Sequence, residues 1–152
     1  MALKTLEIIS IALSALAAGM FCGPWLALTR SISTFEPEVF LTLTRRLSQN
    51  MAGVMTVLFP AAMLSMVPVA VVSYPNHPHT CYLSLAGLAL FIVTLIVTMQ
   101  VEVPIVRQIE ACTPATLPAN WEQLRDRWGA FHIVRVTASF GGLVLLLIGA
   151  IS

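Results

Sequence analysis

The chain has 152 residues, of which 58% are hydrophobic and only 10% are charged, and its mean hydropathy is +0.89. Ordinary soluble domains carry about 25% charged residues, so this composition excludes a soluble globular protein and predicts an integral membrane protein. The formal net charge of +1, with arginines mixed among acidic residues, excludes a nucleic-acid-binding protein. At this length we expect a single domain over residues 1–152.

Four apolar stretches are long enough to cross a bilayer at the helical rise of about 1.5 Å per residue. They are Leu6–Leu28, Met51–Tyr74, Cys81–Val103 and Ile133–Ile151. The predicted fold is therefore an all-α membrane protein, a four-transmembrane-helix bundle. A secretory signal peptide is the alternative for the first stretch, because Lys4 precedes it and small residues follow at a cleavage-like spacing. We expect this stretch to be retained as a span.

The connections carry two further helix signals. The segment Glu38–Gln49 predicts a short amphipathic helix that brings Arg45 and Arg46 to the membrane surface. Asn120, with Gln123 three residues later, resembles a capping pair. The fourth helix is therefore predicted to begin near Asn120 and to extend well beyond its membrane span.

Basic residues are distributed unequally between the two predicted membrane faces. Seven of the eight lie at one face, and only Lys4 lies at the other. The seven are Arg30, Arg45, Arg46, Arg107, Arg125, Arg127 and Arg135. The positive-inside tendency places the first and third connections in the cytosol and both termini on the opposite side. A solvated loop surface accounts for most of these charges.

One stripe of side chains runs along the last predicted helix, from its polar start into its apolar span. It comprises Trp121, Arg125, Trp128, His132, Arg135, Ser139 and Gly142. Steps of four and three residues keep these positions within an arc of about 100°, so they share one helix face. Ionisable groups at the edge of a membrane span are costly to keep, which makes this face the first place to search for function.

An acid and a histidine are predicted to meet at this face. Glu102 ends the third span and His132 begins the fourth, and consecutive helices usually pack side by side. We therefore expect the carboxylate to orient His132 as a general base. Arg125 and Arg135 lie two turns and one turn from His132, where they could hold an anionic substrate or a developing oxyanion.

Aromatic residues near the same membrane face could bind a flat ligand. Trp25, Trp121 and Trp128 offer ring faces for stacking. Asn50, at the start of the second span, either lines the same pocket or caps its helix. Tryptophans at a membrane interface also act as anchors, and arginines near span ends extend toward the headgroups. Both interpretations stay open for the tryptophans, whereas an inward-facing His132 and Arg135 favour a functional site.

The sequence offers no clear metal or disulfide site. His77 and His79 flank a proline in a predicted turn, with no Cys, Asp or Glu nearby to complete a metal site. The three cysteines cannot all pair with one another, and we expect unpaired thiols. Phosphate-binding glycine loops, nucleophile elbows and Cys-x-x-Cys motifs are missing from the sequence. No resident cofactor is therefore expected, with haem or a metal ion left as an alternative.

Several motifs in the second half resemble the C-terminal signature of the anthrone oxygenase-like family of small four-span membrane proteins. They are Glu102-Val103-Pro104-Ile105, Leu117-Pro118, the segment Trp121–Trp128 and His132-Ile133-Val134-Arg135. The span layout resembles the family over nearly the whole chain, whereas the specific motifs are confined to residues 102–135. Many members have Asn where this chain has Glu102, and Asn or Asp where it has Val106. These two differences bear on which substrate the protein binds more than on its fold.

The resemblance implies an activity. Fungal members are associated with the oxygenation of anthrones to anthraquinones without an evident metal or flavin, with O2 as co-substrate. Such a site needs a base, an oxyanion stabiliser, aromatic walls and exclusion of water. The implied function is a cofactor-independent membrane oxygenase or related oxidoreductase acting on a hydrophobic aromatic or polyketide-like molecule. His132 would be the base, Arg125 and Arg135 the stabilisers, and the tryptophans the walls.

A non-enzymatic function is the main alternative. A membrane protein of this size could bind a lipid, a quinone or haem, or assist assembly or transport. Ala138, Gly141 and Gly142 permit close approach of helices, so a homo-oligomer is compatible with either function. An ion or solute transporter is less favoured, because no ionisable residue falls near the middle of a predicted span.

Overall fold

The computed structural model describes residues 2–152 and, among them, every side chain except that of residue 29. The helices, in chain order, are α1 (Ala2–Ala27), the 3-10 helix η1 (Thr29–Thr34), α2 (Pro37–Ser73), α3 (Pro78–Val97), the π-helical segment η2 (Thr98–Glu102), α4 (Val103–Glu110) and α5 (Trp121–Ile151). No strand occurs within residues 2–152. The prediction of an all-α fold is confirmed.

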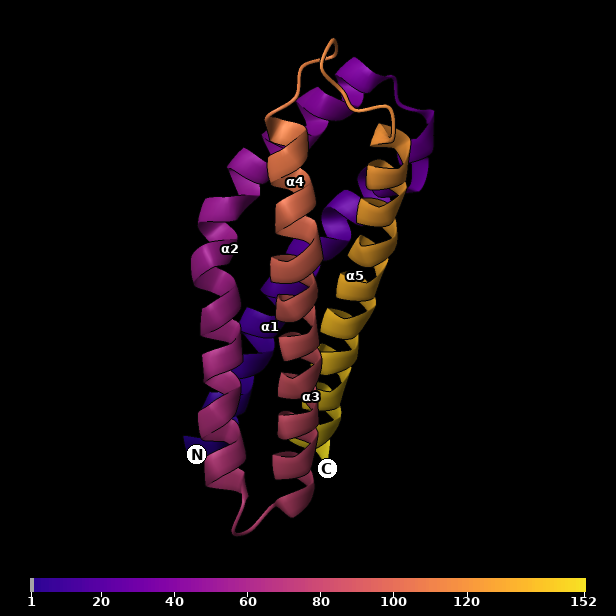
Figure 1. The fold of residues 1–152 in the computed structure, drawn as a ribbon. Helices are drawn as coiled ribbons and strands as arrows, with labels where there is room; N and C mark the ends of the chain where they lie inside the picture. The colour runs from indigo at the N-terminus through magenta and orange to yellow at the C-terminus, as the bar shows by residue number, and fades with distance from the viewer. Residues whose placement is uncertain (1) are drawn as a thin grey trace.

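The long helices form a closed ring in which each contacts two neighbours. Helix α1 packs against α2 and α5, and α3 packs against the same two helices from the other side. Both termini and the short turn between α2 and α3 lie at one end, which we call the terminal end (Figure 1). The two longer connections lie at the other, the charged end. Successive long helices therefore run antiparallel.

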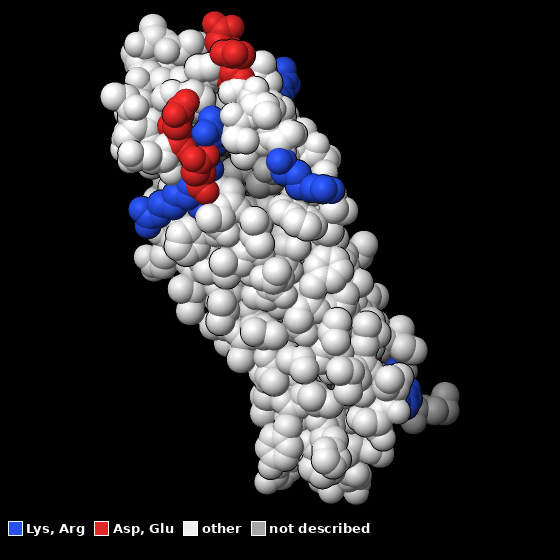
Figure 2. All heavy atoms as spheres, turned by 90° about the vertical axis from the view of Figure 1, so that its right-hand side faces the viewer, with Lys and Arg blue, Asp and Glu red and all other residues white. Residues whose placement is uncertain are grey.

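Four helical segments are long and apolar enough to cross a membrane: Ala2–Thr34, Pro37–Ser73, Pro78–Glu110 and Trp121–Ile151. The four predicted spans fall within these segments to within one residue. On the face shown in Figure 2, acidic and basic side chains gather at the charged end, a smaller basic patch marks the terminal end, and the surface between them is uncharged. An uncharged belt between two polar ends is the surface expected of an integral, multi-pass membrane protein.

Helix α2 differs from its prediction in one respect. The amphipathic segment Glu38–Gln49 is helical, but it continues directly into the second span, and its first turns lie across the charged end (Figure 1). The reason is that no Gly or Pro separates Glu38 from Met51, so nothing interrupts the backbone hydrogen bonds. Asn50 consequently lies inside α2 and does not cap a helix.

Helix α5 begins at Trp121, one residue after Asn120, as predicted. The side chain of Asn120 makes no capping hydrogen bond. Instead its backbone carbonyl oxygen accepts from the N–H groups of Gln123 (3.1 Å) and Leu124 (3.2 Å). The helix then runs without interruption for 31 residues, which carries the polar stripe from the charged end into the bundle.

Glycines allow α3 and α5 to approach closely. A Cβ atom on Gly142 would lie 2.8 Å from the Phe91 ring and 3.0 Å from the carbonyl oxygen of Gly87. A Cβ on Gly141 would lie 3.1 Å from the side chain of Leu90. Small residues at such crossings let helix backbones approach in membranes. Two of the small residues considered for oligomer contacts, Gly141 and Gly142, therefore serve helix packing within one chain.

Two apolar clusters fill the ring and leave a polar layer between them. The cluster nearer the terminal end includes Phe21, Phe59 and Phe91, whose rings contact one another at centroid distances of 5.5 and 5.4 Å. The cluster at the charged end includes Phe40 and Trp128. His132 lies between them, because it follows Trp128 by one helical turn and bonds to the backbone of Phe21. This layer contains the candidate site.

Candidate active site

The predicted stripe on α5 is the buried face of that helix. Arg125, Trp128, His132, Arg135, Ser139 and Gly142 are buried, and Trp121 is half-buried. The prediction that these side chains share one inward face is confirmed. Inside a membrane bundle, buried ionisable groups must find partners within the protein, so the contacts of His132 and Arg135 determine what this face can do.

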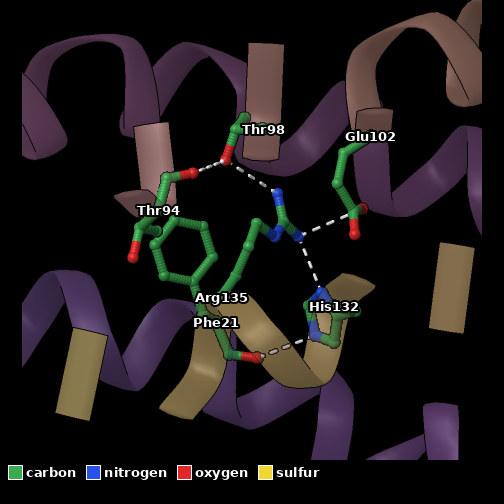
Figure 3. A network of polar contacts seen from close by, with 6 residues as sticks. All are labelled: Phe21, Thr94, Thr98, Glu102, His132 and Arg135. Carbon is green, nitrogen blue, oxygen red and sulfur yellow. Dashed lines mark hydrogen bonds and ion pairs between the residues drawn. The ribbon is translucent and has the colours of Figure 1, made fainter. Parts of the chain in front are cut away.

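Arg135 is the centre of the polar network (Figure 3). Its Nη2 donates to Nδ1 of His132 at 2.7 Å and lies 3.4 Å from Oε2 of Glu102. Its Nη1 donates to Oγ1 of Thr98 at 3.4 Å. The guanidinium carbon also lies 4.8 Å from the centroid of the Phe21 ring, a cation–π contact. One guanidinium therefore joins helices α1 and α5 to the π-helical segment η2.

The two ring nitrogens of His132 have different partners, which assigns its protonation state. A guanidinium can only donate, so Nδ1 must accept the bond from Arg135. A backbone carbonyl can only accept, so Nε2 must carry the proton that is donated to the oxygen of Phe21 at 3.1 Å. His132 is thus a neutral imidazole, protonated on Nε2, and its basic lone pair faces Arg135.

Glu102 is positioned by a local change of helix type. In η2 the N–H of Val103 bonds to the carbonyl of Thr98, five residues back. Pro104 follows directly, and a proline can neither donate to the carbonyl four residues earlier nor fit close to it. A π turn accommodates this defect, and such turns are frequent at functional sites. Oε1 of the buried Glu102 makes no hydrogen bond to any described residue.

The predicted acid and histidine are brought together, but through an intermediary. The carboxylate of Glu102 pairs with Arg135, and Arg135 in turn bonds to His132. The expectation that Glu102 itself orients the imidazole is replaced by this arrangement. A strongly basic guanidinium attracts the carboxylate more than a neutral imidazole does, and it offers enough N–H groups to bind both.

Sequence analysis missed the supporting residues Thr94, Thr98 and Phe21. Thr98 donates to the carbonyl oxygen of Thr94 at 2.7 Å while accepting from Arg135. Phe21 contributes its backbone oxygen and its ring. Thr94 and Thr98 had a detectable signal, since they precede Glu102 at steps of four residues in a stretch that is apolar apart from Gln100. Phe21 had none, because a backbone carbonyl leaves no mark in a sequence.

Comparison with known proteins settles the family. The family model described as anthrone oxygenase matches residues 46–145, which include Glu102, His132 and Arg135. The chain belongs to the anthrone oxygenase family. No curated protein and no solved structure matches it.

In this member of the anthrone oxygenase family, the other predicted site residues lie in two places. Trp128 stacks on His132 with a centroid distance of 5.4 Å, so it forms one wall of the polar layer. Arg125 and Trp121 lie closer to the charged end. There Arg125 bonds to Asp126 at 2.9 Å and covers the Trp121 ring at 5.1 Å. Arg125 is thus about 10 Å along the helix from His132 and takes no part in its network.

The last two candidates are placed differently again. Trp25 is half-buried and packs against the apolar cluster that contains Phe21. Asn50 is exposed on α2 and does not belong to the polar network of Figure 3. The pocket predicted between these residues is therefore not assembled around Asn50, because the uninterrupted α2 turns this side chain outward.

Other potential sites are sparse in the described part of the chain. Within residues 2–152, no three His, Cys, Asp or Glu side chains are close enough together to hold a metal ion. All three cysteines are unpaired. The surface hollows include one of about 320 Å³ at Arg45, Arg46 and Gln49, and one of about 140 Å³ at the terminal end. Neither is lined by residues of the Arg135 network.

Proposed function

We propose that this protein is an oxygenase that uses O2 to convert the ring CH2 group of a hydrophobic, anthrone-type aromatic compound into a carbonyl. The observation that carries the proposal is the buried triangle of Glu102, Arg135 and His132 inside a membrane bundle of the anthrone oxygenase family. A neutral imidazole, a fixed cation and a water-poor surrounding are what this reaction requires. The proposal uses no resident metal or flavin.

The reaction balances with substrate and O2 alone. Loss of one CH2 proton gives an anion whose charge is shared between the ring carbon and the oxygen para to it. The carbon transfers electrons to O2 and forms a C–O bond, and the resulting peroxide takes up a proton. Loss of the second C–H proton then breaks the O–O bond, leaving a carbonyl and one molecule of water. The substrate is oxidised and O2 is reduced, so no further reductant is needed.

Arg135 would link substrate binding to proton removal. Hydrogen bonds from a guanidinium to an anionic oxygen are roughly twice as strong as those between neutral groups. As the substrate oxygen gains negative charge, it competes with the neutral Nδ1 of His132 for the same guanidinium. Release of Nδ1 frees the basic lone pair to accept the CH2 proton. The imidazolium formed would then face Glu102, whose Oε2 already lies 3.4 Å from the shared Nη2.

The surrounding side chains would select a flat aromatic substrate. Trp128 already stacks on His132 and would present a parallel wall to a ring system. The Phe21 ring covers the guanidinium and would turn aside to admit the substrate oxygen. The unpartnered Oε1 of Glu102 would accept a hydrogen bond from a phenolic hydroxyl. Hydroxylated anthrones fit this combination of contacts.

The first test is His132→Ala, with Ile133→Ala on the adjacent exposed position as the matched control. General-base catalysis contributes about 100-fold to 10,000-fold, so we expect conversion of hydroxylated anthrones by His132→Ala to fall by at least about 100-fold. Ile133→Ala should keep wild-type activity. Both variants should elute as folded proteins in detergent. Full activity of a folded His132→Ala protein would refute the assignment of the base.

Isotope labelling tests the oxygen source. Under labelled O2, the product carbonyl should carry one labelled oxygen atom and the second should appear in water. A purified protein that retains a lipid, quinone or haem, shows no turnover under oxygen and incorporates no label would instead support the non-enzymatic alternative. Metal analysis and an absorbance spectrum of the same preparation test the absence of a resident cofactor.

The orientation in the membrane is part of this proposal. The charged end, with six of the eight basic residues, would face the cytosol, and the terminal end would face the opposite compartment. In a background of Cys22→Ser and Cys81→Ser, an impermeant maleimide applied from outside should label Asn76→Cys. It should label Cys112 only after permeabilisation. The opposite pattern would invert the topology.

A further inference from the structure

The hollow of about 320 Å³ at the charged end lies on the first turns of α2, and we call it the arginine hollow. It is lined by Thr42, Arg45, Arg46 and Gln49. Each of these side chains carries hydrogen-bond donors, and no carboxylate is among the lining residues. Pockets for small ligands begin at about 300 Å³. The hollow is therefore large enough for a small chemical group, and its walls suit a negatively charged one.

The two arginines are held differently, and neither is neutralised. Arg45 is half-buried, and its Nη2 donates to the carbonyl oxygens of Glu110 (3.1 Å) and Cys112 at the end of α4. These bonds fix the guanidinium, while its Nε and Nη1 make no hydrogen bond to a described residue. Arg46 is exposed and forms no ion pair within residues 2–152. Both positive charges are thus available to an anion in the hollow.

The arginine hollow lies at the depth of the lipid headgroups. The predicted second span begins at Met51, and Arg46 precedes it by five residues, about 8 Å of helix. The headgroup layer on each side of the hydrocarbon is about 5–8 Å thick. The first turns of α2 lie across the charged end (Figure 1), so the other residues of the hollow stay close to this depth. Lipid phosphates occupy the same layer.

An exposed apolar face of α2 continues directly below the hollow. Gly53 follows Gln49 by four residues and Val57 follows by four more, so all three lie on one helix face. A Cβ atom on Gly53 would meet no atom within 4 Å, and Val57 is 71% exposed. The exposed Pro60 extends this face to about the middle of the bilayer, since one leaflet of hydrocarbon corresponds to about ten helical residues. An acyl chain below the hollow therefore has an apolar path along α2.

We infer that the arginine hollow binds the headgroup of an anionic glycerophospholipid, with an acyl chain along α2. Arg45 and Arg46 bind the phosphate, because the planar guanidinium matches phosphate oxygens with two parallel hydrogen bonds. Thr42 and Gln49 donate to the remaining headgroup oxygens. A zwitterionic lipid also carries an ammonium group, for which the hollow has no carboxylate. Basic pockets beside membrane helices bind anionic headgroups by the same contacts.

Native mass spectrometry of the delipidated protein tests this inference. The protein in a non-ionic detergent is titrated with dioleoylphosphatidylglycerol, or with dioleoylphosphatidylcholine, which has the same acyl chains and no net charge. Arg46→Gln removes a charge from the hollow without removing an ion pair within the protein. Arg127→Gln is the matched control, since it removes an exposed charge at the same end on α5, which lies opposite α2 in the ring.

We expect the wild-type protein to bind phosphatidylglycerol at least about fivefold more tightly than phosphatidylcholine. One basic residue near an anionic lipid contributes about 1 kcal/mol, which is about fivefold in Kd. Arg46→Gln should therefore weaken binding of phosphatidylglycerol by about fivefold, whereas Arg127→Gln should leave it unchanged. Equal affinities for the two lipids, or equal losses in the two variants, would overturn the inference.

A competition experiment distinguishes a lipid from a soluble anion. Inorganic phosphate presents a similar charge without acyl chains, so at equal concentration it should not displace phosphatidylglycerol. Displacement would assign the hollow to soluble phosphate compounds and overturn the inference of a lipid. None of the lining residues belongs to the Arg135 network, and every readout is the mass of a bound lipid. The result is therefore independent of whether the protein oxidises anthrones.

Discussion

The bundle buries polar groups at two levels, and each level satisfies them differently. At the upper level, Arg135 joins Glu102, His132 and Thr98 through direct contacts of 2.7–3.4 Å. At the lower level, Ser10 and Ser14 have no side-chain or backbone partner among the described residues. A guanidinium with five N–H groups can join several helices at once, whereas a hydroxyl donates a single hydrogen bond, as Thr80 does to the carbonyl of Gly149 on α5. The long, charged side chain of Arg135 therefore connects helices at the upper level, whereas Ser10 and Ser14 make no such connection at the lower level.

The largest loss of stability is expected from substitution of Arg135, the centre of the upper-level network. Arg135→Leu leaves the carboxylate of Glu102 buried without a counter-charge, which should reduce the free energy of unfolding by about 3–5 kcal/mol. Unfolding in mixed micelles with increasing SDS measures this loss. Replacing both residues with leucine should restore much of the stability, because removal of a whole buried ion pair is often neutral.

Arg127→Leu is the control for this comparison, since Arg127 is exposed, forms no ion pair with a described residue and lies 5.8 Å from the Phe131 ring. It should change stability little. If Arg135→Leu and Arg127→Leu were equally mild, the upper level would not be held together by Arg135.

A smaller effect is expected where α3 and α5 approach each other below the polar layer. Gly142→Ala would place a methyl group 2.8 Å from the Phe91 ring, and overpacking of this kind costs about 1–3 kcal/mol. Gly19→Ala meets no atom within 4 Å and should stabilise α1 by up to about 1 kcal/mol. The same SDS titration should thus give shifts of opposite sign. Shifts of the same sign would contradict the close packing of these two helices.

The smallest effect concerns one peripheral bond of the upper level. Thr98→Val removes the acceptor for Nη1 of Arg135 and should cost about 0.6 kcal/mol, the average for hydrogen bonds measured in a membrane bundle. We expect a clearer decrease in the turnover of anthrone substrates than in stability, because the guanidinium loses one of the hydrogen bonds that fix its position. Thr137→Val, on the exposed side of α5, is the control and should leave turnover unchanged. Equal turnover in the two variants would remove Thr98 from the site.

Much of the fold could be predicted from the sequence because membrane helices leave a simple signal. A bilayer requires about 20 consecutive apolar residues, so four spans can be found without knowledge of their packing. The inward face of α5 was also predictable, since the spacing of His132 and Arg135 fixes their common side. The continuity of α2 was harder to predict. A polar segment before a span indicates a change of environment, but it does not show whether the helix breaks there.

The partner of each buried group could not be predicted. Whether Glu102 meets His132 or Arg135 depends on differences of a few ångströms in helix register, which the glycine contacts between α3 and α5 set. The π turn before Pro104 shifts Glu102 further in a way that helical periodicity does not describe. The missing partners of Ser10 and Ser14 likewise depend on what the neighbouring helices place beside them. Such contacts are properties of the assembled bundle.

The hydrogen bond from Lys4 to the carbonyl of Ala150 (2.6 Å) connects residues 146 positions apart. Because the ribosome makes α1 before α5, this bond can form only after α5 has been synthesised. Until then the polar side of α1, with Glu7 and the two serines, lacks its final neighbour. The contact between α1 and α5 is therefore the one that closes the bundle, and the buried polar groups of α1 are shielded from their surroundings only when α5 is in place.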